Sequence, residues 1–152
     1  MTIDTAKQIG GRRALINQVY AIVIWEIFCF FAITEGDFAN GLIFFIDGQM
    51  NPGLITFFVL LLGATYFLGR SAGKEIFNRP DRYITPGLKY AALVSMIVLA
   101  YLIIVVGFFF ERGPEGAAAF GALLAIVWLI GTIVAVWLVA TKEVMRKIQG
   151  AN

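Results

Sequence analysis

Hydrophobic residues are concentrated in four long stretches, separated by shorter segments rich in polar residues, glycine and proline. The first stretch has 21 residues, enough for an α-helix rising about 1.5 Å per residue to cross a hydrocarbon layer of about 30 Å. The pattern predicts an all-α membrane protein, a single domain over residues 1–152, with four transmembrane helices in two hairpins. The predicted spans are Ala14–Thr34, Gly53–Gly69, Tyr90–Phe110 and Ala119–Ala140.

The composition agrees with a lipid environment. Hydrophobic residues make up 60% of the chain and charged residues only 14%, whereas about a quarter of the residues in a typical soluble domain are charged. The first stretch is also longer than the about 7–15 apolar residues of a signal peptide, so we expect it to remain as a helix. We therefore expect a multi-pass protein of the bacterial inner membrane, surrounded by membrane lipids.

Histidine is absent from the sequence, and Cys29 is the only cysteine. These facts exclude histidine-ligated haem or zinc and an intrachain disulfide. Cys29 lies within an apolar run, where a buried cysteine behaves as a small hydrophobic residue. We expect no cofactor and no metal site.

The charges predict the orientation in the membrane. With the N-terminus, the segment 70–89 and the C-terminus on one side, that side holds eleven basic and four acidic residues, and the other side holds Arg112 with five acidic residues. Because loops rich in Lys and Arg stay inside, both termini are predicted to be cytoplasmic. The eleven basic residues are Lys7, Arg12, Arg13, Arg70, Lys74, Arg79, Arg82, Lys89, Lys142, Arg146 and Lys147.

The segment 70–89 is predicted to be a basic cytoplasmic loop between the two hairpins. We expect this segment to contact anionic lipids or an acidic surface of a partner through Arg70, Lys74, Arg79 and Arg82. Each Lys or Arg near the membrane surface contributes about 1 kcal/mol to binding anionic lipid. The segment is short and also contains acidic residues, so nucleic acid is not expected as a partner.

Prolines and glycines predict where the connections lie. Asn51-Pro52 and Thr85-Pro86 are typical of an N-cap followed by a proline that opens a helix. In the loop before Pro52, the apolar patch Leu42–Ile46 is too short to span a membrane. We interpret it as an interfacial half-turn, with Asp47 as a turn residue; a segment that dips into the membrane under protein cover is the alternative.

The second and fourth spans align without gaps at an offset of 68 residues. The alignment pairs Gly63 with Gly131, Ala72 with Ala140, and Lys74-Glu75 with Lys142-Glu143. Either the two hairpins are a parallel internal repeat, or two apolar helices with basic ends resemble each other by chance. The sequence leaves both alternatives open.

Glu26 is the only charged residue within a predicted span. An ionised side chain near the middle of a bilayer costs at least about 2.5 kcal/mol, so such residues face the bundle interior or a wet cavity. No span contains a Lys or Arg to pair with Glu26, so we expect its protonated form to dominate. Gln18 and Glu26 lie on one predicted face of the first helix, and Tyr101 and Thr132 lie at similar depth.

Three roles for Glu26 remain open at this stage. It can be a neutral hydrogen-bonding residue between helices, a proton or cation site, or a contact with a partner subunit. A line of small residues at Ala117, Gly121 and Ala125 predicts close helix packing, within the chain first and in an oligomer second.

Three families share limited features with this chain. The number of helices and the glutamate Glu26 in the first of them resemble the small multidrug resistance transporters. The sequences YFLG at residues 66–69 and TPG at residues 85–87 resemble the membrane-associated eicosanoid and glutathione metabolism family. In size and topology it resembles the small subunits of tripartite carboxylate transporters. No resemblance includes a family's full motif pattern, so no family is assigned.

The first functional hypothesis is a non-enzymatic accessory or scaffold subunit of a larger membrane complex, with other membrane protein subunits as partners. Segments of about twenty residues outside the spans are too short for a catalytic domain, which needs about 40 residues or more. The alternative is a small proton-coupled transporter that acts as a homo-oligomer, with Glu26 as its intramembrane site. A membrane enzyme that uses Arg82 and Tyr83 on a lipid substrate is the third hypothesis.

Overall fold

The computed structural model describes the backbone of residues 1–34, 38–50, 52–110 and 117–150, and most of their side chains. In these residues it confirms the all-α prediction. Four helices are long and one is short. They are α1 (Ile3–Thr34), α2 (Phe38–Gln49), α3 (Pro52–Asn78), α4 (Ile84–Phe110) and α5 (Ala117–Gln149), and a 3-10 turn, η1 (Pro80–Arg82), lies between α3 and α4.

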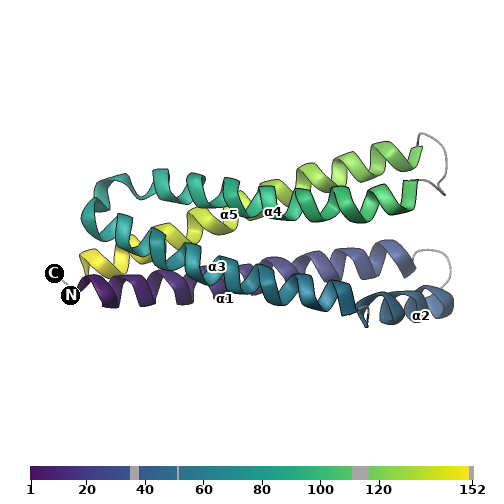
Figure 1. Cartoon of the computed structure of the whole chain (residues 1–152), viewed down its shortest axis with the longest axis horizontal. Coiled ribbons are helices and arrows are strands. Elements are labelled where there is room, and N and C mark those ends of the chain that lie inside the picture. Colours follow the sequence, from purple (N-terminus) through teal and green to yellow (C-terminus); the bar gives the residue numbers. More distant parts are fainter. Residues whose placement is uncertain (35–37, 51, 111–116, 151–152) are drawn as a thin grey trace.

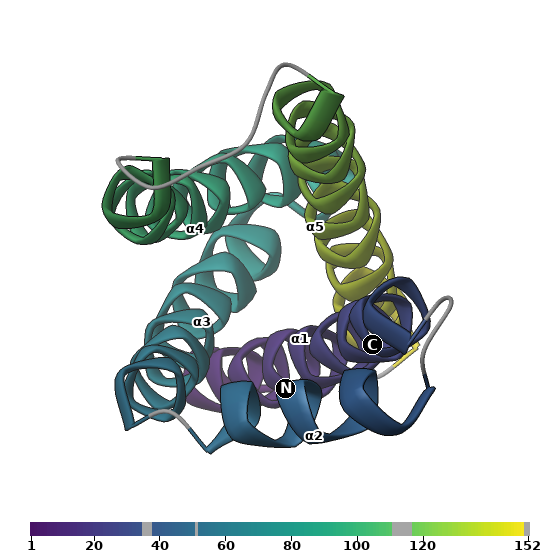
Figure 2. The ribbon, with the colours of Figure 1, turned by 90° about the vertical axis from the view of Figure 1, so that its right-hand side faces the viewer.

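The long helices are arranged in the order α1, α3, α4 and α5 around the bundle (Figure 2), and each contacts its neighbour in this order. α5 also packs against α1 and so closes the ring. Both termini and the turn between α3 and α4 lie at one end of the bundle, and α2 lies beside α1 at the other end (Figure 1). The end that carries the termini is called the basic end below, because it contains eleven of the twelve Lys and Arg residues.

The prediction that residues 70–89 form a loop is wrong. α3 continues to Asn78, and α4 begins at Ile84, so only residues 79–83 connect the two helices. The continuation is stabilised by packing, because Ala72, Gly73 and Ile76 are buried. Residues 3–13 are also helical, although the sequence prediction began the first helix at Ala14. Hydropathy marked the apolar part of each helix but missed its packed polar extension.

The interpretation of Leu42–Ile46 as a half-turn is also wrong, because these residues lie within the twelve-residue helix α2. Asp47 is therefore a helical residue rather than a turn residue. α2 packs mainly against α1, and this contact supports a helix that is too short to be stable alone. Pro52 opens α3 as predicted, whereas α4 begins one residue before Thr85.

α1 and α3 approach each other closely through small residues. A Cβ atom added to Gly10 would lie 2.8 Å from the Cα atom of Gly73, and one added to Gly69 would lie 2.7 Å from the carbonyl oxygen of Gly10. Ala6 and Ala14 lie one turn before and after Gly10 and are buried. Small residues allow two helix backbones to make this close contact. Ala6 and Gly10 lie before the predicted span Ala14–Thr34, so hydropathy alone did not indicate this contact.

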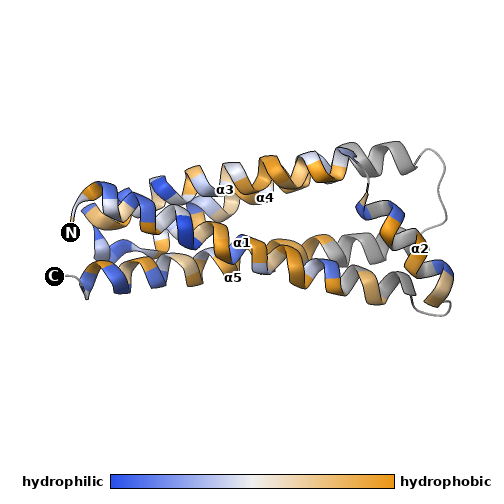
Figure 3. Ribbon diagram, turned by 90° about the horizontal axis from the view of Figure 1, so that it is seen from below, coloured by the Kyte–Doolittle hydropathy of each residue, from blue (hydrophilic) through white to orange (hydrophobic). Residues whose placement is uncertain are grey.

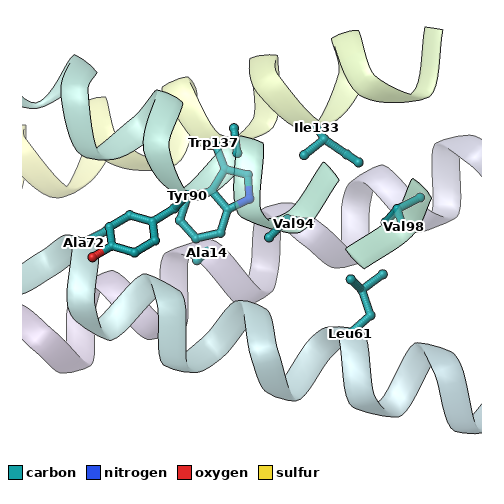
Figure 4. Close-up of a cluster of buried hydrophobic side chains, with 9 residues drawn as sticks. Ala14, Leu61, Ala72, Tyr90, Val94, Val98, Ile133 and Trp137 are labelled. Carbon is teal, nitrogen blue, oxygen red and sulfur yellow. The ribbon is translucent and has the colours of Figure 1, made fainter. Parts of the chain in front are cut away.

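Two buried clusters hold the bundle together. The larger contains side chains from α1, α3, α4 and α5, among them Ala14, Leu61, Tyr90 and Trp137 (Figure 4). The smaller lies at the basic end, where Ala6, Ile76, Val144 and Ile148 pack together. The polar extensions of the helices thus have a hydrophobic core of their own.

The two return helices α3 and α5 bury equivalent positions at the offset of 68 residues. The pairs of buried residues are Thr65 with Ile133, Gly69 with Trp137, Ala72 with Ala140, Gly73 with Thr141, and Ile76 with Val144. α1 and α4 show the same relation at an offset of 77 residues. Their buried pairs are Gly10 with Gly87, Ala14 with Ala91, Gln18 with Ser95, and Ala21 with Val98. This correspondence in burial supports the internal-repeat alternative.

Two helices, among the residues described, are long and apolar enough to cross a membrane: α3 and the part of α4 from Ile84 to Tyr101. Only 17% and 39% of their apolar windows are buried, so the rest of the chain does not cover them as it would cover a core helix. Length and composition alone are weak evidence for a membrane location. Hydrophilic residues gather at the basic end, and hydrophobic residues follow the middle of the bundle (Figure 3).

Some predicted features lie outside the described side chains. They are Cys29 and the small-residue line Ala117, Gly121 and Ala125.

Candidate functional site

Glu26 lies on α1 where α2 packs against it. The side-chain oxygen Oε2 of Glu26 accepts a hydrogen bond from the side-chain amide of Gln49, at the end of α2. Glu26 is partly buried in this contact. The hydrogen bond joins two residues that are 23 positions apart in the sequence and lie on different helices, so within the described residues Glu26 helps to fix α2 on the bundle.

Gln18 and Glu26 point in different directions. Eight residues at about 100° per residue turn the helix by about 80° beyond two full circles. Gln18 faces the core and is 3% exposed, whereas Glu26 is turned toward α2. Between them, Ile22 packs against the larger buried cluster. The predicted face of α1 that holds Gln18 and Glu26 thus contacts the core at Gln18 and α2 at Glu26.

Tyr101 packs on a neighbouring helix, and Thr132 lies on α5. The ring of Tyr101 stacks on the ring of Phe57 in α3, with a centroid distance of 3.7 Å and an angle of 12° between the planes. Thr132 is partly buried on α5. The structure thus joins Glu26 to Gln49 and Tyr101 to Phe57, rather than gathering the four predicted residues around one point.

The interior of the bundle instead holds polar atoms from every long helix. Gln18, Thr65, Ser95 and Trp137 are all less than 10% exposed, and each has a polar side-chain atom without a hydrogen-bond partner among the described residues. Buried polar residues of this kind occur where helices pack inside a membrane bundle. Ser95 and Trp137 were not among the predicted residues, because the prediction selected polar residues on the face of Glu26 or at its depth.

The basic end contains a network around Glu75 on α3. Its Oε1 atom accepts hydrogen bonds from Lys89 Nζ and from the Tyr90 hydroxyl, each at 2.6 Å. Tyr90 in turn packs on Trp137 of α5, with ring centroids 5.9 Å apart. Glu75 therefore links α3 to α4, and Tyr90 continues the link to α5.

Glu75 lies beyond the apolar segment 53–69 and has a shifted pKa. Partial burial raises the pKa of this carboxyl, but the hydrogen bonds from Lys89 and Tyr90, together with the charge of Lys89, outweigh burial and lower the pKa below its ordinary value. Glu75 is therefore ionised at neutral pH, and its charge is balanced by Lys89.

An equivalent ion pair joins α5 to α1. Arg13 lies 3.1 Å from the carboxylate of Glu143, with both side chains about a third exposed. Glu143 corresponds to Glu75 at the offset of 68, and Arg13 corresponds to Tyr90 at the offset of 77. Each hairpin therefore contributes an acidic residue that binds the outgoing helix of the other hairpin.

The four basic residues predicted to contact lipid or a partner occupy different places. Arg70 lies over α1, where its side chain covers Gly11, and Lys74 is exposed on α3. Arg79 and Arg82 line one cavity at the turn between α3 and α4. The structure thus brings together only Arg79 and Arg82.

Comparison with known proteins gives no relative: no family model, no curated protein and no solved structure matches the chain. The described residues also contain no group of three or more acidic, cysteine or histidine side chains that could hold a metal ion.

Proposed function

We propose that this protein is a small integral membrane protein that serves as an accessory or scaffold subunit of a larger membrane complex. Its four long helices cross the bilayer of the bacterial inner membrane as two hairpins, with the basic end in the cytoplasm. The role is non-enzymatic, and the partners are other membrane protein subunits.

The distribution of side chains supports a lipid environment. Large hydrophobic side chains are exposed on the outer faces of all four long helices, while Gln18, Thr65 and Ser95 are buried. A soluble monomer rarely exposes apolar surface on this scale, because contact with water is unfavourable. The exposed residues include Val23, Ile24, Ile27, Val59, Leu60, Phe67, Met96, Val127 and Val139.

One observation favours a scaffold role: the helices continue beyond their apolar segments into a packed basic end. Ala6, Ile76, Val144 and Ile148 form its core, and eight basic side chains are exposed around it. A packed core holds these charges on ordered helices, which suits a surface that other subunits contact. The eight residues are Arg12, Lys74, Arg79, Arg82, Lys89, Lys142, Arg146 and Lys147.

The direct test is the size of the native assembly. Membranes that contain a tagged chain at its natural level are solubilised in a mild detergent and separated by native electrophoresis. We expect the 16.7 kDa chain to migrate with a second membrane protein at a fixed ratio. A chain that migrates only alone or with copies of itself would contradict the accessory role.

Glu26 distinguishes this proposal from the proton-coupled transporter. In the scaffold account Glu26 binds Gln49, and an amide can make the same hydrogen bond, so Glu26→Gln should change the unfolding free energy by about 0.6 kcal/mol or less. Glu26→Leu leaves Gln49 without its partner and should cost more, about 1–3 kcal/mol. Thermal unfolding in detergent measures both variants.

Two controls complete this prediction. The double variant Glu26→Leu with Gln49→Leu removes both partners and should recover part of the loss. In reconstituted vesicles, the transporter alternative expects Glu26→Gln to abolish pH-dependent uptake while the fold stays intact. That outcome would favour the transporter over the scaffold.

A further inference from the structure

We propose that the cavity at the turn between α3 and α4 binds a phosphate group, most favourably that of an anionic phospholipid. The cavity has a volume of about 290 Å³, the lower end of the range for small-molecule sites. Its lining residues are Glu75, Asn78, Arg79, Arg82, Thr85 and Pro86. The lipid part of the proposal rests on the membrane placement proposed above.

The net charge of the lining is positive. The carboxylate of Glu75 is already bound by Lys89 and Tyr90, so it does not neutralise the two arginines. Asp81 is 3.9 Å from Arg82, with both side chains about 70% exposed, and such an exposed pair contributes little. Arg79 forms no ion pair within the part of the chain that the structure describes. Both guanidinium groups are thus available to an anion.

The backbone of the turn explains why both arginines line the same cavity. Residues 80–82 form the 3-10 turn η1, and the backbone N–H of Arg82 donates a hydrogen bond to the carbonyl of Arg79 at 3.1 Å. This hydrogen bond closes the turn, so Arg79, which precedes the turn, is held near Arg82, its last residue. Arginine binds phosphate oxygens through two parallel N–H groups, so a pair of arginines suits this ligand. Asn78 and Thr85 add an amide and a hydroxyl donor.

Exposed apolar residues follow the cavity along α4. Ile84 and Leu88 are one helical turn apart, and they are 51% and 48% exposed. An inorganic anion gains nothing from these side chains, whereas the acyl chain of a phospholipid can cover them while its phosphate occupies the cavity. The combination of a cationic cavity and an apolar strip favours a lipid over free phosphate.

Lipid binding to the purified protein in detergent tests the proposal by native mass spectrometry. We expect the parent protein to retain phosphatidic acid in preference to phosphatidylcholine. Replacing Arg79 and Arg82 together with glutamine should weaken phosphatidic acid binding about 30-fold. The control replaces Arg146 and Lys147 of α5 with glutamine. It removes the same charge from exposed positions outside the cavity and should leave the preference unchanged.

Each outcome decides one part of the proposal. If both double variants lost phosphatidic acid binding equally, the binding would be a general attraction between charges and the cavity would not be the site. Unchanged phosphatidic acid binding in the Arg79 and Arg82 variant would also overturn the cavity as the site. Inorganic phosphate that displaces phosphatidic acid at millimolar concentration would assign the cavity to free phosphate, and a failure to displace it supports the lipid. These results do not depend on a protein partner, so they are separate from the test of the accessory role.

Discussion

Gly73→Ala should destabilise the protein strongly, although alanine normally favours a helix. The added Cβ atom would overlap the carbonyl oxygen of Ala6 and would lie 3.2 Å from the Cα atom of Gly10. These are backbone atoms, which cannot rotate away as a side chain does, so α1 must move. Overpacking of this kind costs about 1–3 kcal/mol or more. Thermal unfolding in detergent, followed by circular dichroism, measures the loss.

The chain provides matched controls for this substitution. A Cβ atom added to Gly63 on α3 or to Gly131 on α5 meets no atom within 4 Å. Because alanine is a better helix former than glycine, Gly63→Ala and Gly131→Ala should be neutral or stabilising by about 0.5–1 kcal/mol. Gly10→Ala should behave like Gly73→Ala. If all four variants showed the same stability, α1 and α3 would not pack as described.

Hydropathy was sufficient to predict the long helices of the fold. Each predicted span lies within α1, α3, α4 or α5, because a long apolar run has few other ways to satisfy its backbone groups. Hydropathy did not predict where the helices end. Residues 3–13 and 70–78 are polar or rich in glycine, and they are helical because Ala6, Gly73 and Ile76 pack together at the basic end. That packing depends on helices that are distant in the sequence.

The candidate sites could be predicted only in part. Charge identified Glu26, Arg79 and Arg82, but the Gln49 partner of Glu26 lies on α2, a helix that the sequence did not predict. The link between Glu75 and Tyr90 depends on a turn of only five residues between α3 and α4. Spacing along one helix locates a residue on a face, but it does not determine which neighbouring helix covers that face.

The two hairpins show the same pattern of buried and ion-paired positions. Glu75 and Glu143 occupy equivalent positions, and each binds the outgoing helix of the other hairpin. An alignment of two apolar helices gives little support for a repeat, because their composition is similar. Agreement in which positions are buried, in both pairs of helices, is stronger support because it reflects the same packing in each hairpin.

Labelling of single cysteines from one side of the membrane tests the central claim most directly. In a Cys29→Ala background, Met50→Cys places a thiol at the end near α2, and Gln149→Cys places one at the basic end; both positions are exposed. An impermeant maleimide added to intact spheroplasts should label Met50→Cys at once and Gln149→Cys only after the membrane is opened. This is the result expected from the proposed cytoplasmic location of the basic end. If Gln149→Cys is labelled in intact spheroplasts and Met50→Cys is protected, the proposed orientation is contradicted. If neither position is labelled and alkaline carbonate releases the chain, a membrane-spanning bundle is contradicted.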